Sequence, residues 1–130
     1  MNISENISFS TLCSLKIHEM APFYCELNSE EELNEISEFL DREKIKHCVL
    51  GDGTNIVPTG KFNGLVIKNK LKGIKREGTK IEVASGENWH SFVDLSLSEE
   101  LFGLENLALI PGTVGAVSYT HLRAHETKRN

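Results

Sequence analysis

Two glycine-bearing stretches carry the residue types and spacing that could bind a phosphate. The first, LGDGTNI, covers residues 50–56, and the second, ALIPGTVGA, covers residues 108–116. A glycine lets the backbone adopt positive φ and lets another group approach without a Cβ in the way. Consecutive amide N–H groups in such a turn form a concave site for an anion. We therefore predict that the two stretches are the two sides of one cleft that binds a phosphodiester.

The side chains of the first stretch favour this interpretation, although a plain hairpin turn stays open as an alternative. Thr54 and Asn55 add a hydroxyl and an amide beside the glycines, and both groups can hold a phosphate. The Asp52 carboxylate would repel an anion, so we expect it to point outward or to cap its own turn. Two better-known phosphate motifs do not fit. A dinucleotide fingerprint would have Ile56 in place of its third glycine, and Phe62 follows the Gly-Lys pair of a possible Walker loop.

The strands that would position these stretches are indicated by apolar alternation and by flanking glycines. Residues 1–8 are polar and are expected to be frayed, and residues 9–17 are expected to lie as an extended arm over the domain. A hairpin turn is expected at Gly78-Thr79. The expected strands are residues 22–27, 47–50, 64–68, 72–75 and 80–84, the fourth continuing the third after a small kink.

Two helices are expected among these strands. Ser29 and Glu32 have capping-box spacing, so the first helix should run from about Glu30 to Glu43. The residues expected on its buried face are Leu33, Ile36, Phe39 and Leu40. The second helix should begin near residues 86–88, and its buried side should hold Trp89, Phe92 and Val93. An apolar loop or short turn is expected at 101–107. This order of elements predicts two small α+β lobes.

Charge and composition exclude several classes of protein. A net charge of −5 over 130 residues argues against a nucleic-acid or anionic-membrane surface. No apolar run reaches membrane-spanning length, and the N-terminus does not have the pattern of a signal peptide. Cys13, Cys25 and Cys48 are odd in number and lack CxxC spacing. We expect buried, reduced thiols in a cytoplasmic protein, without disulfides or a zinc site.

Four motifs in order give the chain a resemblance to a known family. They are LGDGTNI at residues 50–56, KGI at 72–74, GENWH at 86–90 and GLENLALIPGTVG at 103–115. This series resembles UDP-N-acetylenolpyruvoylglucosamine reductase, the flavoenzyme that completes UDP-N-acetylmuramate in bacterial cell-wall synthesis. The resemblance extends over residues 9–116.

The resemblance implies an α+β fold of the vanillyl-alcohol-oxidase (PCMH) type, in which two small α+β lobes clasp FAD, with the second lobe truncated here. It implies that the first stretch meets the pyrophosphate and that the second lies along the cofactor. The cofactor-binding residues implied in this way are Gly51, Asp52, Gly53, Thr54, Asn55, Ile56, Ile110, Pro111, Gly112, Thr113, Val114 and Gly115. It also implies NADPH and a UDP-sugar as partners of the full-length enzyme, and a role in peptidoglycan synthesis, cell shape and cell division.

No catalytic residue is assigned. Trp89 is expected in the core beside Phe92, and His90 is expected on the helix surface or supporting a neighbouring group, because the sequence shows no partner for it. The serine that protonates the substrate in the resembled family, and the arginine and glutamate that assist it, belong to later segments and cannot be mapped onto this chain.

The resemblance stops after Ala116. Residues 117–130 are similar to a translated adapter sequence, and they carry three basic residues and one acid, so that residues 1–116 alone would have a charge of −7. His121 and His125 are four apart, as zinc ligands can be, but no third ligand is evident and we expect no metal site.

The expected organisation is an N-terminal arm at residues 1–20, a partial FAD-binding domain at 21–116 and a non-native tail at 117–130. Such a chain should bind FAD only, should be inactive by itself, should retain FAD weakly and should tend to aggregate. Two alternatives stay open. One is another flavin oxidoreductase of the same domain type, and the other is a non-catalytic module that binds a nucleotide or a protein partner through the acidic first helix.

Overall fold

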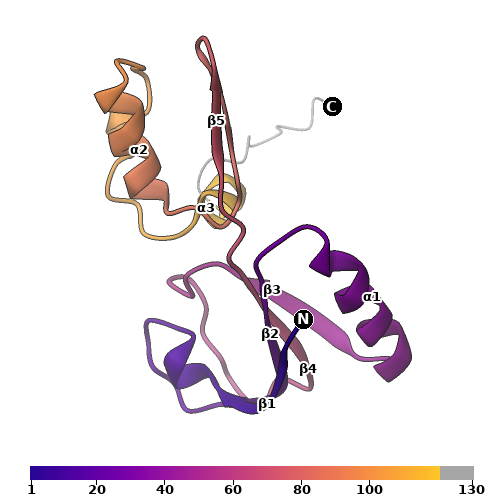
Figure 1. Cartoon of the computed structure of the whole chain (residues 1–130). Helices are drawn as coiled ribbons and strands as arrows, with labels where there is room; N and C mark the ends of the chain where they lie inside the picture. Colours follow the sequence, from indigo (N-terminus) through magenta and orange to yellow (C-terminus); the bar gives the residue numbers. More distant parts are fainter. Residues whose placement is uncertain (121–130) are drawn as a thin grey trace, which may run out of the picture.

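A computed structural model describes residues 1–120, which fold into two lobes joined by residues 70–73 (Figure 1). We call residues 1–69 the first lobe and residues 74–120 the second lobe. The first lobe holds a four-stranded sheet and the second a two-stranded one, each accompanied by helices. The predicted two-lobed α+β fold is therefore confirmed.

The sheet of the first lobe has the strand order β1-β2-β4-β3. These strands are β1 (Ile3–Ser8), β2 (Met20–Leu27), β4 (Gly64–Asn69) and β3 (Lys46–Leu50). β1 is antiparallel to β2, whereas β2, β4 and β3 are parallel to one another. Because parallel neighbours need long connections, β3 reaches β4 only through the long loop that contains the first glycine stretch.

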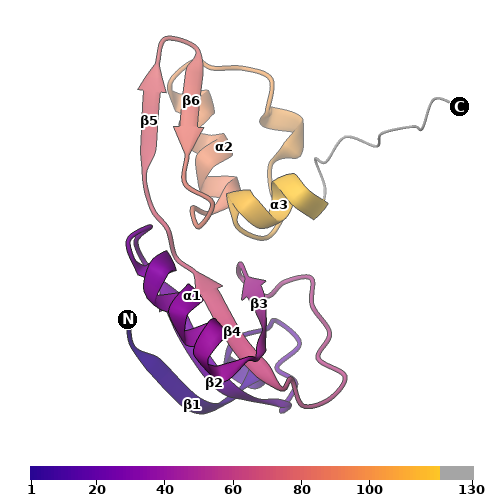
Figure 2. The same cartoon turned by 90° about the vertical axis from the view of Figure 1, so that its right-hand side faces the viewer.

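Both faces of this sheet are covered, and β4 shows why the sequence permits it. Its near-continuous apolar run is typical of a strand buried on two sides. Leu65 and Ile67 pack with Ile36 and Phe39 of helix α1 (Glu32–Glu43), while Val66 packs on the other side. Figure 2 shows α1 lying across the strands.

The N-terminal residues are more ordered than their polarity indicates. Residues 3–8 form β1, paired along β2, so the expectation of a frayed end is wrong. A polar edge strand is held by backbone hydrogen bonds, which leave no apolar pattern in the sequence. The expected extended arm at 9–17 is instead a turn that begins with the 3₁₀ helix η1 (Phe9–Thr11), and it covers the sheet opposite α1. The residues that it buries are Phe9, Leu12 and Cys13.

Helix α1 begins two residues later than predicted and forms half of the expected capping box. The Glu32 carboxylate accepts hydrogen bonds from the amides of Asn28 at 2.8 Å and Ser29 at 3.4 Å. The other half of the capping box, a side-chain hydrogen bond from the N-cap residue to an amide of the first turn, is not formed. Leu33 was expected on the buried face but is 48% exposed, because the packed face is centred on Ile36 and Phe39.

All three cysteines belong to the first lobe. Cys13 and Cys25 are buried and Cys48 is half-buried. Burial raises the pKa of the Cys25 thiol to about 11 and also raises that of Cys48. These two thiols are therefore protonated and slow to react near neutral pH.

The second lobe pairs a hairpin with short helices. Its strands are β5 (Ile74–Glu77) and β6 (Lys80–Val83), joined by a turn in which Gly78 has φ +61°. β5 belongs to a separate sheet, so the expectation that it continues β4 after a small kink is wrong. The helices are α2 (Trp89–Ser98), η2 (Glu105–Leu107) and α3 (Val114–Thr120).

Helix α2 follows its prediction closely. The Asn88 carboxamide oxygen accepts a hydrogen bond from the Ser91 amide at 2.9 Å, which caps the helix. Trp89, Phe92 and Val93 form the predicted buried side. Val117, the first residue of the segment expected to be foreign, packs in the same cluster. Within residues 1–120, no helix has the length and apolar character needed to cross a bilayer.

Polar contacts fasten the two lobes together around residues 70–73. The Asn69 side-chain amide donates to the Ser85 hydroxyl at 2.7 Å, and the Lys72 ammonium donates to the Gly86 carbonyl at 2.9 Å. Gly86 lies so close to the connecting segment that an added Cβ would be 2.5 Å from the carbonyl oxygen of Leu71. A glycine is therefore required there by packing.

Candidate functional site

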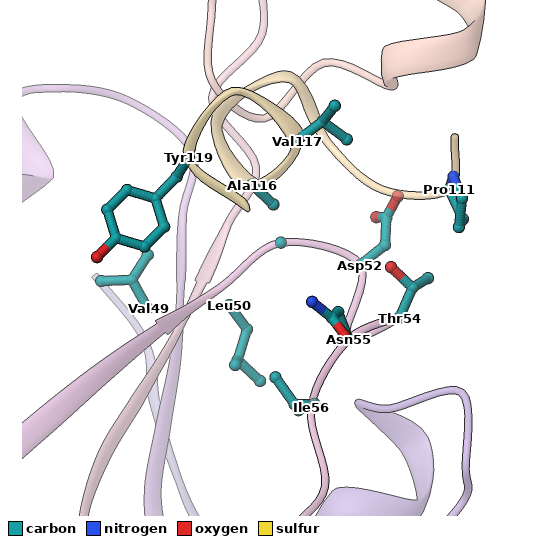
Figure 3. A pocket seen from close by; sticks show the side chains of 12 residues that line it. Val49, Leu50, Asp52, Thr54, Asn55, Ile56, Pro111, Ala116, Val117 and Tyr119 are labelled. Atoms are coloured by element: carbon teal, nitrogen blue, oxygen red, sulfur yellow. The ribbon is translucent and has the colours of Figure 1, made fainter. Parts of the chain in front are cut away.

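A cleft of about 190 Å³ opens where the loop after β3 faces the second lobe (Figure 3). Its walls come from both glycine stretches, as predicted. The lining residues are Val49, Leu50, Gly51, Asp52, Gly53, Thr54, Asn55, Ile56, Pro111, Ala116, Val117 and Tyr119. Ligand pockets for whole small molecules have volumes of about 300–1,000 Å³, so this cleft fits a part of a dinucleotide rather than all of it.

The first wall is the loop at residues 51–56, and Lys68 of β4 holds its beginning. The Lys68 ammonium donates a hydrogen bond to the Gly51 carbonyl and lies 3.8 Å from the Asp52 carboxylate. Asp52 lines the cleft, so the expectation that it points outward or caps its own turn is wrong, and Lys68 of the neighbouring strand partly neutralises its carboxylate. Lys68 did not stand out in the sequence, because a lysine in a strand gives no sign of which loop it meets.

Packing inside the protein explains the two glycines of this loop. Gly53 has φ +67°, and an added Cβ would overlap the carbonyl oxygen of Leu12 and lie 2.9 Å from the Cα of Cys13. At Gly51 an added Cβ would lie 2.5 Å from the Thr113 hydroxyl oxygen. The groups that come close to these glycines are therefore the N-terminal turn and the second lobe, whereas the sequence interpretation had a ligand in that place.

The backbone of the same loop offers hydrogen-bond donors at residues that line the cleft. Within residues 1–120, the amides of Asp52, Gly53, Thr54 and Asn55 donate to no protein acceptor. The Thr54 hydroxyl and the Asn55 carboxamide line the cleft beside them (Figure 3). A row of successive N–H groups with added side-chain donors suits the oxygens of a diphosphate.

The second glycine stretch contributes less directly. Pro111 lines the cleft, whereas Ile110 and residues 112–115 do not. The amide of Val114 donates to the Glu87 carbonyl at 2.8 Å, and that of Gly115 donates to the Ser85 carbonyl at 2.9 Å. These amides fasten the stretch to the second lobe. Their assignment to the cofactor stays a prediction that rests on the resemblance.

Three lining residues lie outside the two predicted stretches. They are Val49 near the end of β3 and Val117 and Tyr119 of α3, whereas Leu50 and Ala116 are end residues of the stretches themselves. Figure 3 shows α3 passing over the loop, with Tyr119 above Val49. Val117 and Tyr119 were not considered as lining residues, because both belong to the segment that we expect to be foreign.

Trp89 and His90 support the second wall. The Trp89 side chain is buried, as predicted, and its indole N–H donates to the Leu107 carbonyl at 2.7 Å. His90 lies at the helix surface, and its Nδ1 accepts a hydrogen bond from the Leu109 amide at 3.1 Å. Leu109 is brought to His90 only by the fold, so the sequence could not show this partner, whereas Asp94, four residues further along the same helix, was overlooked.

Metal ligands do not gather in the described part of the chain. Among residues 1–120, no group of three or more His, Cys, Asp or Glu side chains could hold a metal ion. His121 and His125, the pair weighed as zinc ligands, lie outside the described residues.

The chain is similar to curated reductases over a limited part of their length. It is 38% identical over 136 residues to UDP-N-acetylenolpyruvoylglucosamine reductase of Paraburkholderia xenovorans, covering 96% of this chain and 39% of that protein. It is 49% identical over 86 residues to the protein of the same name from Paraburkholderia phymatum, covering 62% and 25%. The chain thus spans about a quarter to two fifths of these relatives.

A solved structure gives the same relationship. The crystal structure of UDP-N-acetylenolpyruvylglucosamine reductase (MurB) from Thermus caldophilus matches with a TM-score of 0.68 and 26% identity. The match covers 88% of this chain and 40% of that one. Residues 21–129 match the model of a family described as an FAD binding domain. The chain therefore belongs to this family of FAD-binding domains, in a form similar to part of the UDP-N-acetylenolpyruvoylglucosamine reductases, and its cofactor is FAD.

Proposed function

We propose that this chain supplies the part of a UDP-N-acetylenolpyruvoylglucosamine reductase that binds the diphosphate bridge of FAD. The observation that carries the proposal is the row of amides at residues 52–55, which belong to residues lining the cleft and donate to no protein acceptor within residues 1–120. Thr54 and Asn55 add donors, and Lys68 holds the beginning of the loop and offsets the charge of Asp52. The cleft volume of about 190 Å³ suits a diphosphate and not the whole dinucleotide.

The reaction of the whole enzyme lies beyond these residues. We propose that the full-length protein uses NADPH and a UDP-sugar with an enolpyruvyl group, in cytoplasmic peptidoglycan synthesis that sustains cell shape and division. Bound FAD would supply the hydride chemistry of that reduction. The residues of this chain bind and orient the cofactor. The polypeptide of residues 1–130 should therefore show no sustained turnover.

We also propose the division of the chain that the resemblance implies. Residues 21–116 are the FAD-binding part, residues 1–20 precede it as an arm that contributes β1, and residues 117–130 are a non-native segment. Burial of Val117 beside Trp89 is a packing contact and is compatible with either origin of that segment.

A titration with three ligands tests the diphosphate assignment. FAD and ADP share a diphosphate, whereas riboflavin has the flavin ring and its ribityl chain without any phosphate. We expect FAD to bind, ADP to compete with it, and riboflavin to bind far more weakly, as measured by flavin fluorescence and by calorimetry. Equal affinity for FAD and riboflavin would refute the assignment. Equal affinity for ADP and FAD would favour the alternative of a non-catalytic module that binds a nucleotide.

Matched variants within one loop locate the site. Thr54→Val and Asn55→Ala each remove one donor from the cleft, and we expect each to weaken FAD binding about 10-fold to 100-fold, since hydrogen bonds to a charged group contribute about 1.5–3 kcal/mol. Thr59→Val and Asn63→Ala make the same changes at exposed positions of the same loop outside the cleft, and should leave the affinity unchanged. Similar losses in both pairs would place the diphosphate elsewhere.

A further inference from the structure

Leu109 has a backbone conformation that its own side chain does not explain. Its φ is +63°, in the left-handed region that is unfavourable for residues with a Cβ. Its side chain is 78% exposed, so apolar packing does not hold it there. Some other contact must offset the strain, because a strained residue persists only where its surroundings fix it.

His90 provides that contact. Its Nδ1 accepts the hydrogen bond from the Leu109 amide at 3.1 Å, which requires this nitrogen to be unprotonated. Its Nε2 lies 3.4 Å from the Asp94 carboxylate, one helical turn further along α2. A carboxylate at that position favours the tautomer with the proton on Nε2, and this leaves Nδ1 as an acceptor.

The same turn of α2 holds the chain on both sides of Leu109. The indole N–H of Trp89 donates to the Leu107 carbonyl at 2.7 Å, and the Trp89 amide donates to the Gly112 carbonyl at 3.0 Å. Pro111, two residues after Leu109, lines the cleft. Pro111 therefore lies between two points that this turn of α2 holds, Leu109 at His90 and Gly112 at Trp89.

We propose that His90 is a positioning residue for the cofactor cleft: by accepting the Leu109 amide it enforces the left-handed turn that places Pro111 on the second wall. The inference rests on the proposed function, since it assigns His90 to the site that binds FAD. His90 itself is not among the residues that line the cleft.

Four proteins test the proposal. His90→Phe keeps a ring and removes the acceptor, while His90→Gln keeps an acceptor oxygen. Leu109→Gly removes the conformational strain, and it is made alone and together with His90→Phe. FAD affinity is measured by flavin fluorescence, the exchange of the backbone amide at position 109 by NMR in the absence of FAD, and stability by urea unfolding followed through Trp89.

We expect His90→Phe to weaken FAD binding about fivefold to tenfold. The variant loses the hydrogen bond to the Leu109 amide, and Leu109 is then no longer kept in its left-handed conformation. His90→Gln should stay within about twofold of the wild type. The double variant should recover most of the loss, because glycine adopts the turn without strain. A residue with a merely structural role would instead give equal losses in His90→Phe and in the double variant, together with lower unfolding midpoints.

Two results would overturn the proposal. One is an unchanged rate of Leu109 amide exchange in His90→Phe, and the other is FAD affinity equal to that of the wild type in that variant. If the wild type itself binds no FAD, the proposed function fails, and the exchange measurement on the unliganded protein still decides whether His90 holds Leu109.

Discussion

Three glycine-to-alanine substitutions in the loop between β3 and β4 should have three different effects. At Gly53 an alanine must adopt φ +67° and its Cβ would overlap the backbone at Leu12. The left-handed conformation costs about 1–2 kcal/mol and the overlap about 1–3 kcal/mol, so we expect a loss of about 2–5 kcal/mol in the stability of the first lobe. At Gly51 the backbone is compatible with alanine, but the Cβ would lie 2.5 Å from the Thr113 hydroxyl oxygen.

The effect at Gly51 should fall on the contact between the lobes. Thr113 is buried, with 3% exposure, so it cannot simply move away. An overlap of about 1–3 kcal/mol that widens the cleft would weaken FAD binding by about 5-fold to 100-fold. Thr113→Ala in the same chain removes the hydroxyl and should restore most of the affinity. Gly60→Ala is the matched control, because nothing lies within 4 Å of its added Cβ.

The chain carries separate reporters for the two lobes. Its three cysteines all lie in the first lobe, and its one tryptophan, Trp89, lies in the second. Urea unfolding followed by thiol labelling and by Trp89 fluorescence therefore reports the lobes independently. Gly53→Ala should lower the midpoint measured by the thiols, and Gly51→Ala should lower FAD affinity more than either midpoint. The reasoning is refuted if Gly53→Ala unfolds at the wild-type midpoint, or if Gly51→Ala and Gly60→Ala bind FAD equally well.

Three further predictions follow from other parts of the structure. Lys68→Met removes the ammonium that holds the Gly51 carbonyl and should weaken FAD binding about tenfold in a fluorescence titration, whereas Lys70→Met, which removes an exposed partner of Glu26, should not. Burial raises the pKa of the Cys25 thiol from 9.0 to about 11, so its contribution to stability is complete below pH 9 and is lost as the pH rises toward 11. Urea midpoints at pH 8 and pH 10.5 should differ in the wild type by more than in Cys25→Ala, and equal differences would contradict the burial argument. Sequencing the gene beyond the codon for Ala116 should reveal a continuation unlike residues 117–130, and recovery of the same 14 codons from genomic DNA would show that the segment is native.

Local signals predicted the elements whose causes lie within a few residues. The cap at Asn88 and the apolar spacing of Trp89, Phe92 and Val93 are properties of one helix, and α2 forms as expected. By contrast, β1 depends on pairing with β2, and polar residues on an edge strand give no periodic signal. Leu33 has helical spacing yet is exposed, because periodicity does not show how far along a helix the packed sheet extends.

The sequence predicted which stretches form the cleft, but not the residues that hold these stretches in place. The first glycine stretch does line a cleft, and Pro111 of the second faces it. The reason for glycine at positions 51 and 53 was missed, because the Thr113 hydroxyl and the Leu12 carbonyl come near only in the folded chain. The roles of Lys68 and His90 were missed for the same physical reason: each meets a backbone group more than 15 residues away in sequence.

The short path from β4 to β5 has a thermodynamic consequence for any molecule that enters between the lobes. Hydrogen bonds at Asn69 and Lys72, and the close fit of Gly86 on the backbone beside it, leave this joint little freedom to bend. We expect these contacts to hold the walls of the cleft near one separation before a cofactor arrives, so that part of the entropy of aligning them is lost when the chain folds. Such preorganisation lowers the entropic cost of binding, and we expect a dinucleotide to enter through the open rim of the cleft rather than by separation of the lobes.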